Sequence, residues 1–172
     1  MSVAFRRESD EEHLEPKFEL PIAPGPNLVT PRGLALIGAR VEELEAAVAA
    51  ETDETRRQSL ERDLRYWRTR RATAQLAEPP VPGEVGIGSR VTFRQGEKAR
   101  TIEIVGTDEA DPAAGRLGFQ APLARALLGG VEGERVDFNG VADALEIVEI
   151  VHDLSKVVHG CRRRDILNNH KD

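Results

Sequence analysis

The chain has little cysteine, few aromatic side chains and no long apolar run. Its 172 residues include one cysteine, Cys161, and 4% aromatic residues. A single cysteine excludes an intramolecular disulfide. No apolar run approaches the roughly 20 residues of a bilayer span, and the N-terminal residues lack the apolar core of a signal peptide. We therefore expect a cytoplasmic protein that makes no membrane contact and forms one or two small globular units.

The chain is negatively charged overall. A net charge of -6 argues against a protein held to duplex DNA by bulk electrostatics. Hydrophobic residues make up 40% of the chain, which is enough apolar material for a folded core. His159 and Cys161 have no partners at metal-ligand spacing, so we expect no stably bound cofactor.

Two apolar stripes at helical spacing are the clearest signal in the sequence. Their positions mirror each other about Glu54, as expected for two helices that fold back on each other. The spacing predicts an antiparallel helical hairpin over residues 30–78 with an acidic tip at residues 51–54. An intermolecular pairing through residues 34–74 fits the same pattern, so a dimeric coiled-coil adaptor stays open. The stripe residues are Leu34, Ile37, Val41, Leu44 and Val48, then Leu60, Leu64, Trp67, Arg71 and Ala74.

Capping residues mark the ends of both predicted helices. Thr30 before Pro31 is an N-cap followed by proline at the first helical position. Thr55 and Gln58 stand at capping-box spacing and predict the start of the second helix. The proline-rich residues 79–83 predict its end. Each arm therefore has roughly 20 residues and a length of about 30 Å.

The rest of the chain divides at its prolines and glycines. Residues 1–29 predict an extended N-terminal arm, and residues 79–84 predict a linker. Residues 85–152 alternate between apolar and polar in short stretches, with one short helix at 122–128. Residues 153–172 have no strong period and predict a C-terminal tail. The expected fold class is α+β, with a helical hairpin followed by a small antiparallel β domain.

The segment that begins at Ile104 reads IVGTDEADPAAGRLGFQAPLARALLG, and VEGERV follows from Val131. This segment resembles the C-terminal signature of the bacterial GreA/GreB transcription elongation factors. That signature runs I-V-G-x-D-E-A-D, then S/A-P-L-A/G-R-A-L-[IL]-G, then a G-[DE]-x-V strand. Arg62 and the stretch Arg65-Tyr66-Trp67 are also similar to the family's returning helix. The resemblance covers about residues 27–151.

The resemblance implies an accessory factor of bacterial RNA polymerase that is not itself an enzyme. An FKBP-like domain over residues 85–152 would dock at the polymerase secondary channel, and the hairpin would insert toward the active site. In the family, two tip acids share a Mg²⁺ ion with the polymerase and promote cleavage of backtracked RNA. Carboxylates suit this role because a hard divalent ion prefers charged oxygen ligands. The chain is then expected to be a monomer that contacts nascent RNA only indirectly.

The predicted tip departs from the family pattern. No G-D-x-x-E-N-A-x-Y motif occurs between Val41 and Leu76, and Glu51-Thr-Asp-Glu-Thr stands in its place. Asp53 and Glu54 are candidate Mg²⁺ ligands, because the start of a helix favours ionised carboxylates. Ordinary helix capping explains the same residues. If the tip does not reach the metal, the chain would be a non-cleaving competitor for the secondary channel, similar to the short-armed relative Rnk.

Further candidate residues follow from the resemblance. One loop and the short helix match the family's polymerase-facing segments, and arginines of the second arm match its RNA-contacting patch. An Asp- and Pro-rich turn and a solvated, ion-paired helix face are the alternative interpretations. A peptidyl-prolyl isomerase is another alternative, because the expected domain resembles FKBP. The pockets of such enzymes are lined with aromatic side chains, however, and only 4% of the residues in this chain are aromatic. The candidates are Asp108, Glu109, Asp111, Pro122, Leu123 and Arg125 for the polymerase, and Arg56, Arg57, Arg62 and Arg65 for RNA.

Overall fold

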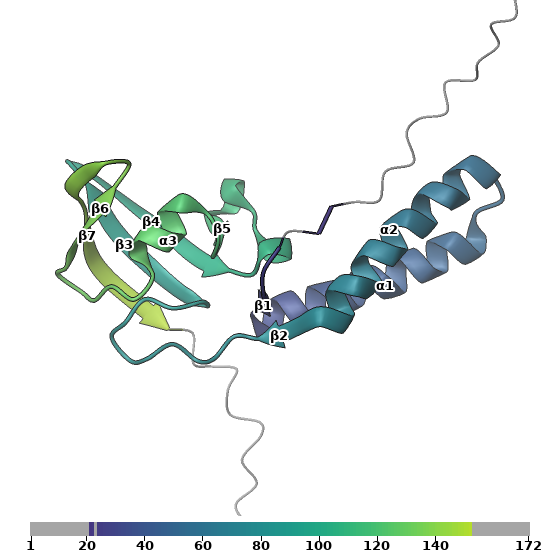
Figure 1. The fold of residues 1–172 in the computed structure, drawn as a ribbon, viewed down its shortest axis with the longest axis horizontal. Coiled ribbons are helices and arrows are strands. Elements are labelled where there is room, and N and C mark those ends of the chain that lie inside the picture. The colour runs from purple at the N-terminus through teal and green to yellow at the C-terminus, as the bar shows by residue number, and fades with distance from the viewer. Residues whose placement is uncertain (1–20, 23, 153–172) are drawn as a thin grey trace, which may run out of the picture.

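The computed structural model describes residues 21–22 and 24–152, and its ribbon is drawn in Figure 1. The tail expected at residues 153–172 and most of the arm expected at residues 1–29 lie outside the described residues. Figure 1 shows a helical hairpin that projects from one end of a small sheet domain.

The two long helices pack against each other as an antiparallel pair. Helix α1 spans Pro31–Ala50 and helix α2 spans Glu54–Thr73. Their contact is apolar because the stripe residues repeat every three to four positions and so share one face of each helix. The predicted intrachain hairpin is confirmed, since both stripes pack within one chain. The buried seam consists of Val41, Leu44 and Leu64, with Val48, Leu60 and Trp67 partly buried against it.

The base of the hairpin differs from the sequence prediction. Leu34 is 36% exposed and Arg71 is also exposed, so neither belongs to the seam. Helix α2 ends at Thr73, before the prolines, because the chain there becomes strand β2 (Ala74–Leu76). Strand β2 pairs in parallel with β1 (Asn27–Val29). The last residues of the expected N-terminal arm are therefore a strand that ties the two ends of the hairpin together.

The capping predictions have different outcomes at the two helices. Thr30 is confirmed as the N-cap of α1, since its side chain accepts a hydrogen bond from the backbone N–H of Gly33 at 2.9 Å. The prediction for α2 is wrong: Asp53 is its N-cap, and Thr55 lies inside the first turn. Asp and Thr both cap helices well, so the sequence contains two possible starts for α2. The structure uses the earlier one, Asp53, and the loop between the two helices is correspondingly shorter.

The sheet domain has five strands in the order β5-β4-β3-β7-β6. All neighbouring pairs are antiparallel except β4 and β5, which are parallel. The expectation of an entirely antiparallel sheet is thus wrong at β5, because two short turns, η1 and η2, carry the chain back before it pairs. The elements are β3 (Ser89–Gln95), β4 (Lys98–Val105), η1 (Thr107–Glu109), η2 (Pro112–Ala114), β5 (Arg116–Gly118), α3 (Pro122–Leu127), β6 (Arg135–Phe138) and β7 (Val141–His152).

The core of the sheet domain lies between one face of the sheet and helix α3. Alternation along β3 turns Val91 and Phe93 to the same face, where both are fully buried. Ala124 and Leu127 of α3 pack on that face, which confirms the predicted short helix and the α+β class. None of the helices in the described part of the chain combines the length and apolar character that a bilayer crossing requires.

Candidate functional site

The loop at the hairpin tip is held by its own acidic side chains. Oε1 of Glu51 accepts hydrogen bonds from the backbone N–H groups of Thr52 and Asp53, both at 2.9 Å. Oδ1 of Asp53 accepts the backbone N–H of Arg56 at 2.9 Å, which is the N-cap bond of α2. Asp53 therefore satisfies a backbone donor that helix formation leaves unpaired, and Glu51 binds N–H groups of the loop itself.

Glu54 is also bound to its own helix. Its Oε1 accepts a hydrogen bond from the side-chain amide of Gln58 at 3.0 Å, and its Oε2 pairs with Arg57. The hydrogen bond from Gln58 and the charge of Arg57 lower the pKa of Glu54 from its ordinary value of 4.5. The carboxylate is therefore ionised at neutral pH.

The tip acids can be compared with the requirements of a metal site. A divalent cation such as Mg²⁺ needs several oxygen ligands in a fixed geometry. Within residues 21–22 and 24–152, no group of three or more His, Cys, Asp or Glu side chains is arranged to hold a metal ion. In this structure Asp53 caps α2, and Glu54 is bound to Gln58 and Arg57.

The arginines of α2 lie in several different environments. Arg57 pairs with Glu54 on its own helix, and Arg56 is exposed at the start of α2. Further along, Nη2 of Arg68 lies 2.7 Å from Oε1 of Glu45, which joins the two helices. Arg62 is partly buried. Pairing across the hairpin, considered as an alternative, is seen for Arg68 with Glu45, whereas Arg57 pairs within its own helix.

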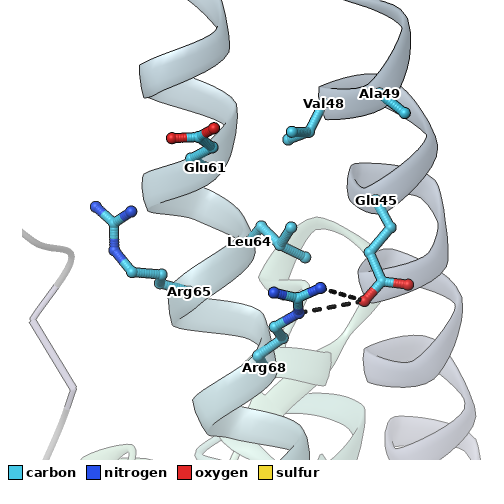
Figure 2. A pocket seen from close by; sticks show the side chains of 7 residues that line it. All are labelled: Glu45, Val48, Ala49, Glu61, Leu64, Arg65 and Arg68. Carbon is cyan, nitrogen blue, oxygen red and sulfur yellow. Dashed lines mark hydrogen bonds and ion pairs between the residues drawn. The ribbon is translucent and has the colours of Figure 1, made fainter.

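A shallow groove runs between the two arms beside this ion pair. In Figure 2, Leu64 and Val48 point toward each other across the groove, and Arg68 reaches over to Glu45. Arg65 lies on the side of α2 that faces away from α1. The groove lining is Glu45, Val48, Ala49, Glu61, Leu64, Arg65 and Arg68.

Asp108 joins the sheet domain to helix α2. Its Oδ2 lies 2.6 Å from Nε of Arg70, and its Oδ1 accepts a hydrogen bond from the Tyr66 hydroxyl at 2.8 Å. The Asp108 and Arg70 side chains are 7% and 5% exposed. Burial, and then the hydrogen bond and charge of Asp108, raise the pKa of Tyr66 above 10.0. The carboxylate predicted to face the polymerase is engaged within the chain.

Glu109, the next residue, joins the sheet domain to the start of helix α1. Its Oε2 accepts a hydrogen bond from the Thr30 hydroxyl at 2.5 Å, and its Oε1 pairs with Nε of Arg32. The Glu109 side chain is 2% exposed. Arg32 also lies 3.2 Å from Oε1 of Glu103 on β4, as an ion pair. Burial acts against the charge of Arg32, but the hydrogen bond and charge of Glu109 outweigh it and raise the pKa of Arg32.

Asn27 completes the contacts at the hairpin base. Its Nδ2 donates to the backbone oxygen of Arg70 at 2.8 Å, and its Oδ1 accepts from Nη2 of Arg70 at 2.5 Å. We call Asn27, Thr30, Arg32, Tyr66, Arg70, Asp108 and Glu109 the junction cluster. Sequence reasoning did not predict a role for Asn27, Thr30, Arg32 or Arg70 here. The structure shows Arg70 buried, whereas the other arginines of α2 are exposed or, at Arg62, partly buried.

The remaining candidates for polymerase contact lie on the surface of the sheet domain. Asp111 caps η2 and its Oδ2 lies 2.7 Å from Nη2 of Arg116. Pro122 and Arg125 are exposed on α3, whereas Leu123 is half-buried against the core. Pro122 and Arg125 therefore form an accessible surface on α3, in contrast to the buried Asp108 and Glu109.

The fold defines a class of small α+β proteins in which a sheet domain carries a protruding antiparallel helical hairpin. Residues 79–152 match the family described as "Transcription elongation factor, GreA/GreB, C-term". The sheet domain is therefore similar to the C-terminal domain of the GreA/GreB factors. The match covers the sheet domain and leaves the hairpin outside it.

Curated relatives agree with the family match. The chain is 40% identical over 72 residues to transcription elongation factor GreA of Leuconostoc mesenteroides, which covers 39% of the chain and 45% of the relative. It is 36% identical over 77 residues to GreA of Vibrio parahaemolyticus, which covers 44% of the chain and 49% of the relative. The chain thus spans less than half the length of these relatives.

Two solved structures are similar to the chain at low identity. GreA factor homolog 1 of Thermus thermophilus is 16% identical with a TM-score of 0.34, covering 74% of the chain and 99% of that protein. GreA/GreB from Nitrosomonas europaea is 20% identical with a TM-score of 0.37, covering 75% of the chain and 100% of that protein.

Proposed function

We infer that this protein is a transcription regulator that binds bacterial RNA polymerase and is not an enzyme on its own. The sheet domain docks at the secondary channel, and the hairpin points toward the active site. The family match over residues 79–152 supports the docking role. The protruding hairpin with its acidic end supports the second role (Figure 1). Such a protein acts in the cytoplasm as a monomer.

The docking surface is helix α3 in this proposal. Pro122 and Arg125 are exposed there, while Ala124 and Leu127 anchor the helix in the core. An exposed arginine on a short, well-anchored helix is suited to bind a carboxylate of a partner.

The hairpin acts by occupying the channel and not by supplying metal ligands. The single observation that carries this choice is the state of the tip, where Asp53 caps α2 and Glu54 is bound to Arg57 and Gln58. A carboxylate that would ligate a metal must first give up these bonds. The protein then competes with other factors that enter the same channel.

Stimulation of RNA cleavage is the second candidate function. Asp53 and Glu54 are adjacent and exposed at the end of the hairpin, and the polymerase would supply the remaining ligands of a shared Mg²⁺. The two candidates differ in one measurable outcome, the shortening of RNA in backtracked complexes.

The test adds the full chain to stalled, backtracked complexes of bacterial RNA polymerase. We expect binding without RNA shortening, together with reduced cleavage when a GreA factor is added afterwards. RNA shortening that disappears in Asp53→Ala and Glu54→Ala would establish the second candidate instead. A chain that does not bind polymerase would refute both.

A matched pair of variants tests the docking surface. Arg125→Ala removes the exposed arginine of α3, and Arg135→Ala removes an exposed arginine of β6. We expect the first variant to weaken polymerase binding and the second to leave it unchanged. Equal affinities would show that α3 does not dock.

A further inference from the structure

One turn of the sheet domain binds both arms of the hairpin. Turn η1 places Asp108 and Glu109 next to each other in the chain. Asp108 binds Arg70 and Tyr66 of α2, whereas Glu109 binds Thr30 and Arg32 at the start of α1. Two consecutive carboxylates therefore connect the sheet domain to two different helices.

This arrangement restrains the direction of the hairpin more strongly than one contact would. A single ion pair lets the hairpin rotate about the bond, but two bonds to separate helices fix both its rotation and its tilt. The Asp108 and Glu109 side chains are 7% and 2% exposed. Water cannot readily replace their partners, since a buried charge without a partner is costly.

The backbone of the turn also lies directly against the hairpin base. A Cβ atom at Gly106 would stand 2.8 Å from the backbone oxygen of Leu28 in β1. A Cβ atom at Gly33 would stand 2.8 Å from Oε2 of Glu109. Glycine at both positions permits this close approach of η1 to β1 and of the Glu109 side chain to α1.

Within the described residues, one further ion pair between the two parts joins Arg32 of α1 to Glu103 of β4 at 3.2 Å. Turn η1 is the sheet-domain element that makes the most contacts with α1 and β1. The covalent connection is the segment after β2, which contains three prolines and a glycine between residues 79 and 83. The orientation of the hairpin therefore depends chiefly on η1.

We propose that Asp108 and Glu109 are positioning residues that set the direction of the hairpin, so that a docked sheet domain delivers the tip to one defined place. This proposal rests on the proposed function for its consequence at the polymerase. It gives these residues an internal role in place of the polymerase contact that the resemblance implied.

The first measurement reports the hairpin direction in the free protein. Spin labels are attached at Thr52→Cys on the tip and Glu97→Cys on the β3–β4 turn of the full chain, with Cys161→Ser to remove the native thiol. Pulsed dipolar spectroscopy then gives the distribution of distances between the labels. We expect Asp108→Asn with Glu109→Gln to broaden this distribution and shift its mean.

The control variant is Glu146→Gln, which neutralises a carboxylate paired with Arg135 inside the sheet domain. We expect it to leave the distance distribution unchanged. Circular dichroism of all variants verifies that the helices and the sheet persist. A folded Asp108→Asn/Glu109→Gln variant with the same distribution as the unaltered chain would overturn the proposal.

The second measurement separates positioning from docking at the polymerase. We expect the Asp108→Asn/Glu109→Gln variant to bind polymerase as the unaltered chain does but to lose about tenfold or more of its potency against GreA-stimulated cleavage. Equal losses of binding and potency with an unchanged distance distribution would make these residues docking residues and refute the proposal. If the unaltered chain fails to bind polymerase, the proposed function fails, while the distance measurement still decides whether η1 sets the hairpin direction.

Discussion

Asp108 and Arg70 form a buried ion pair of 2.6 Å between the two halves of the molecule, although 38 residues separate them in the chain. Each partner has a second hydrogen-bonding neighbour, Tyr66 for Asp108 and Asn27 for Arg70. The pair is therefore part of a network, and the loss of one charge should affect all of its members.

The first prediction concerns the stability that depends on Arg70. Arg70→Met keeps an unbranched side chain but removes the guanidinium group and leaves Asp108 buried without its cation. We expect the free energy of unfolding to fall by about 3–5 kcal/mol, measured by urea denaturation. Arg70→Met with Asp108→Asn should recover part of this loss, because the neutral amide no longer needs a cation.

The control for this prediction is Arg68→Met. Arg68 lies on the same helix as Arg70, and its exposed ion pair is with Glu45 of α1. Exposed pairs contribute about 0–1 kcal/mol. Similar losses for Arg68→Met and Arg70→Met would contradict the role that burial has in this argument.

The second prediction concerns the titration of Tyr66, the only tyrosine in the chain. Its pKa is raised from 10.0 by burial and then by the hydrogen bond and charge of Asp108. The neutral phenol therefore contributes stability below pH 10.0, and this contribution is lost as the pH rises through the raised pKa. We expect phenolate absorbance to appear above the ordinary pH, and Asp108→Asn to lower the pKa partway.

Tyr66→Phe serves as the control for the alkaline loss of stability. This variant should lose less stability on alkaline titration than the unaltered chain, since it has no phenol to ionise. Titration of Tyr66 at its ordinary pKa would show that Asp108 does not bind its hydroxyl in solution.

The hairpin was predictable because its signal is local. Ile37, Val41 and Leu44 are buried at the spacing that the sequence displays, and an amphipathic stripe must find an apolar partner. The nearest partner in the chain was the mirrored stripe. The same argument predicted Leu34 and Arg71 in the seam, and there it failed. At this end of the hairpin, strands β1 and β2 and turn η1 make the contacts instead.

The junction cluster was not predictable, because its contacts are distant in sequence and polar. In the sequence, Asp108 has the features of an ordinary turn residue. Its contact with Arg70 is visible only in the folded structure. Helix periodicity predicts which face is apolar, and it says nothing about a buried arginine that depends on a turn of another domain. The family signature drew attention to the segment around Asp108 but gave no indication that its side chain binds Arg70 and Tyr66.

The third prediction concerns two glycines. Gly106 has φ of -63°, which any residue adopts, so Gly106→Ala is a purely steric test. Its Cβ would meet backbone atoms of β1, at 2.8 Å from the oxygen of Leu28. We expect a loss of about 1–3 kcal/mol in the free energy of unfolding, since backbone cannot move aside cheaply.

Gly38 is the matched position in α1, where an added Cβ meets nothing within 4 Å. Gly38→Ala should stabilise the protein by about 0.5–1 kcal/mol, because alanine loses less backbone entropy in a helix. Both values come from chemical denaturation. An equal response at the two positions would mean that η1 does not lie against β1 as the structure has it.

The last prediction separates capping from metal binding at the tip. As an N-cap, Asp53 can be replaced by asparagine or serine at little cost, whereas Asp53→Ala should destabilise α2 by about 1 kcal/mol. Hydrogen exchange of the first turn of α2 and urea denaturation measure the stability of these three variants. As a metal ligand, Asp53 would need its negative charge, so Asp53→Asn would be as harmful to activity as Asp53→Ala. We expect Asp53→Asn to keep both the stability and the effect on polymerase, because the structure uses Oδ1 to accept a backbone N–H, and an amide oxygen accepts that bond as well.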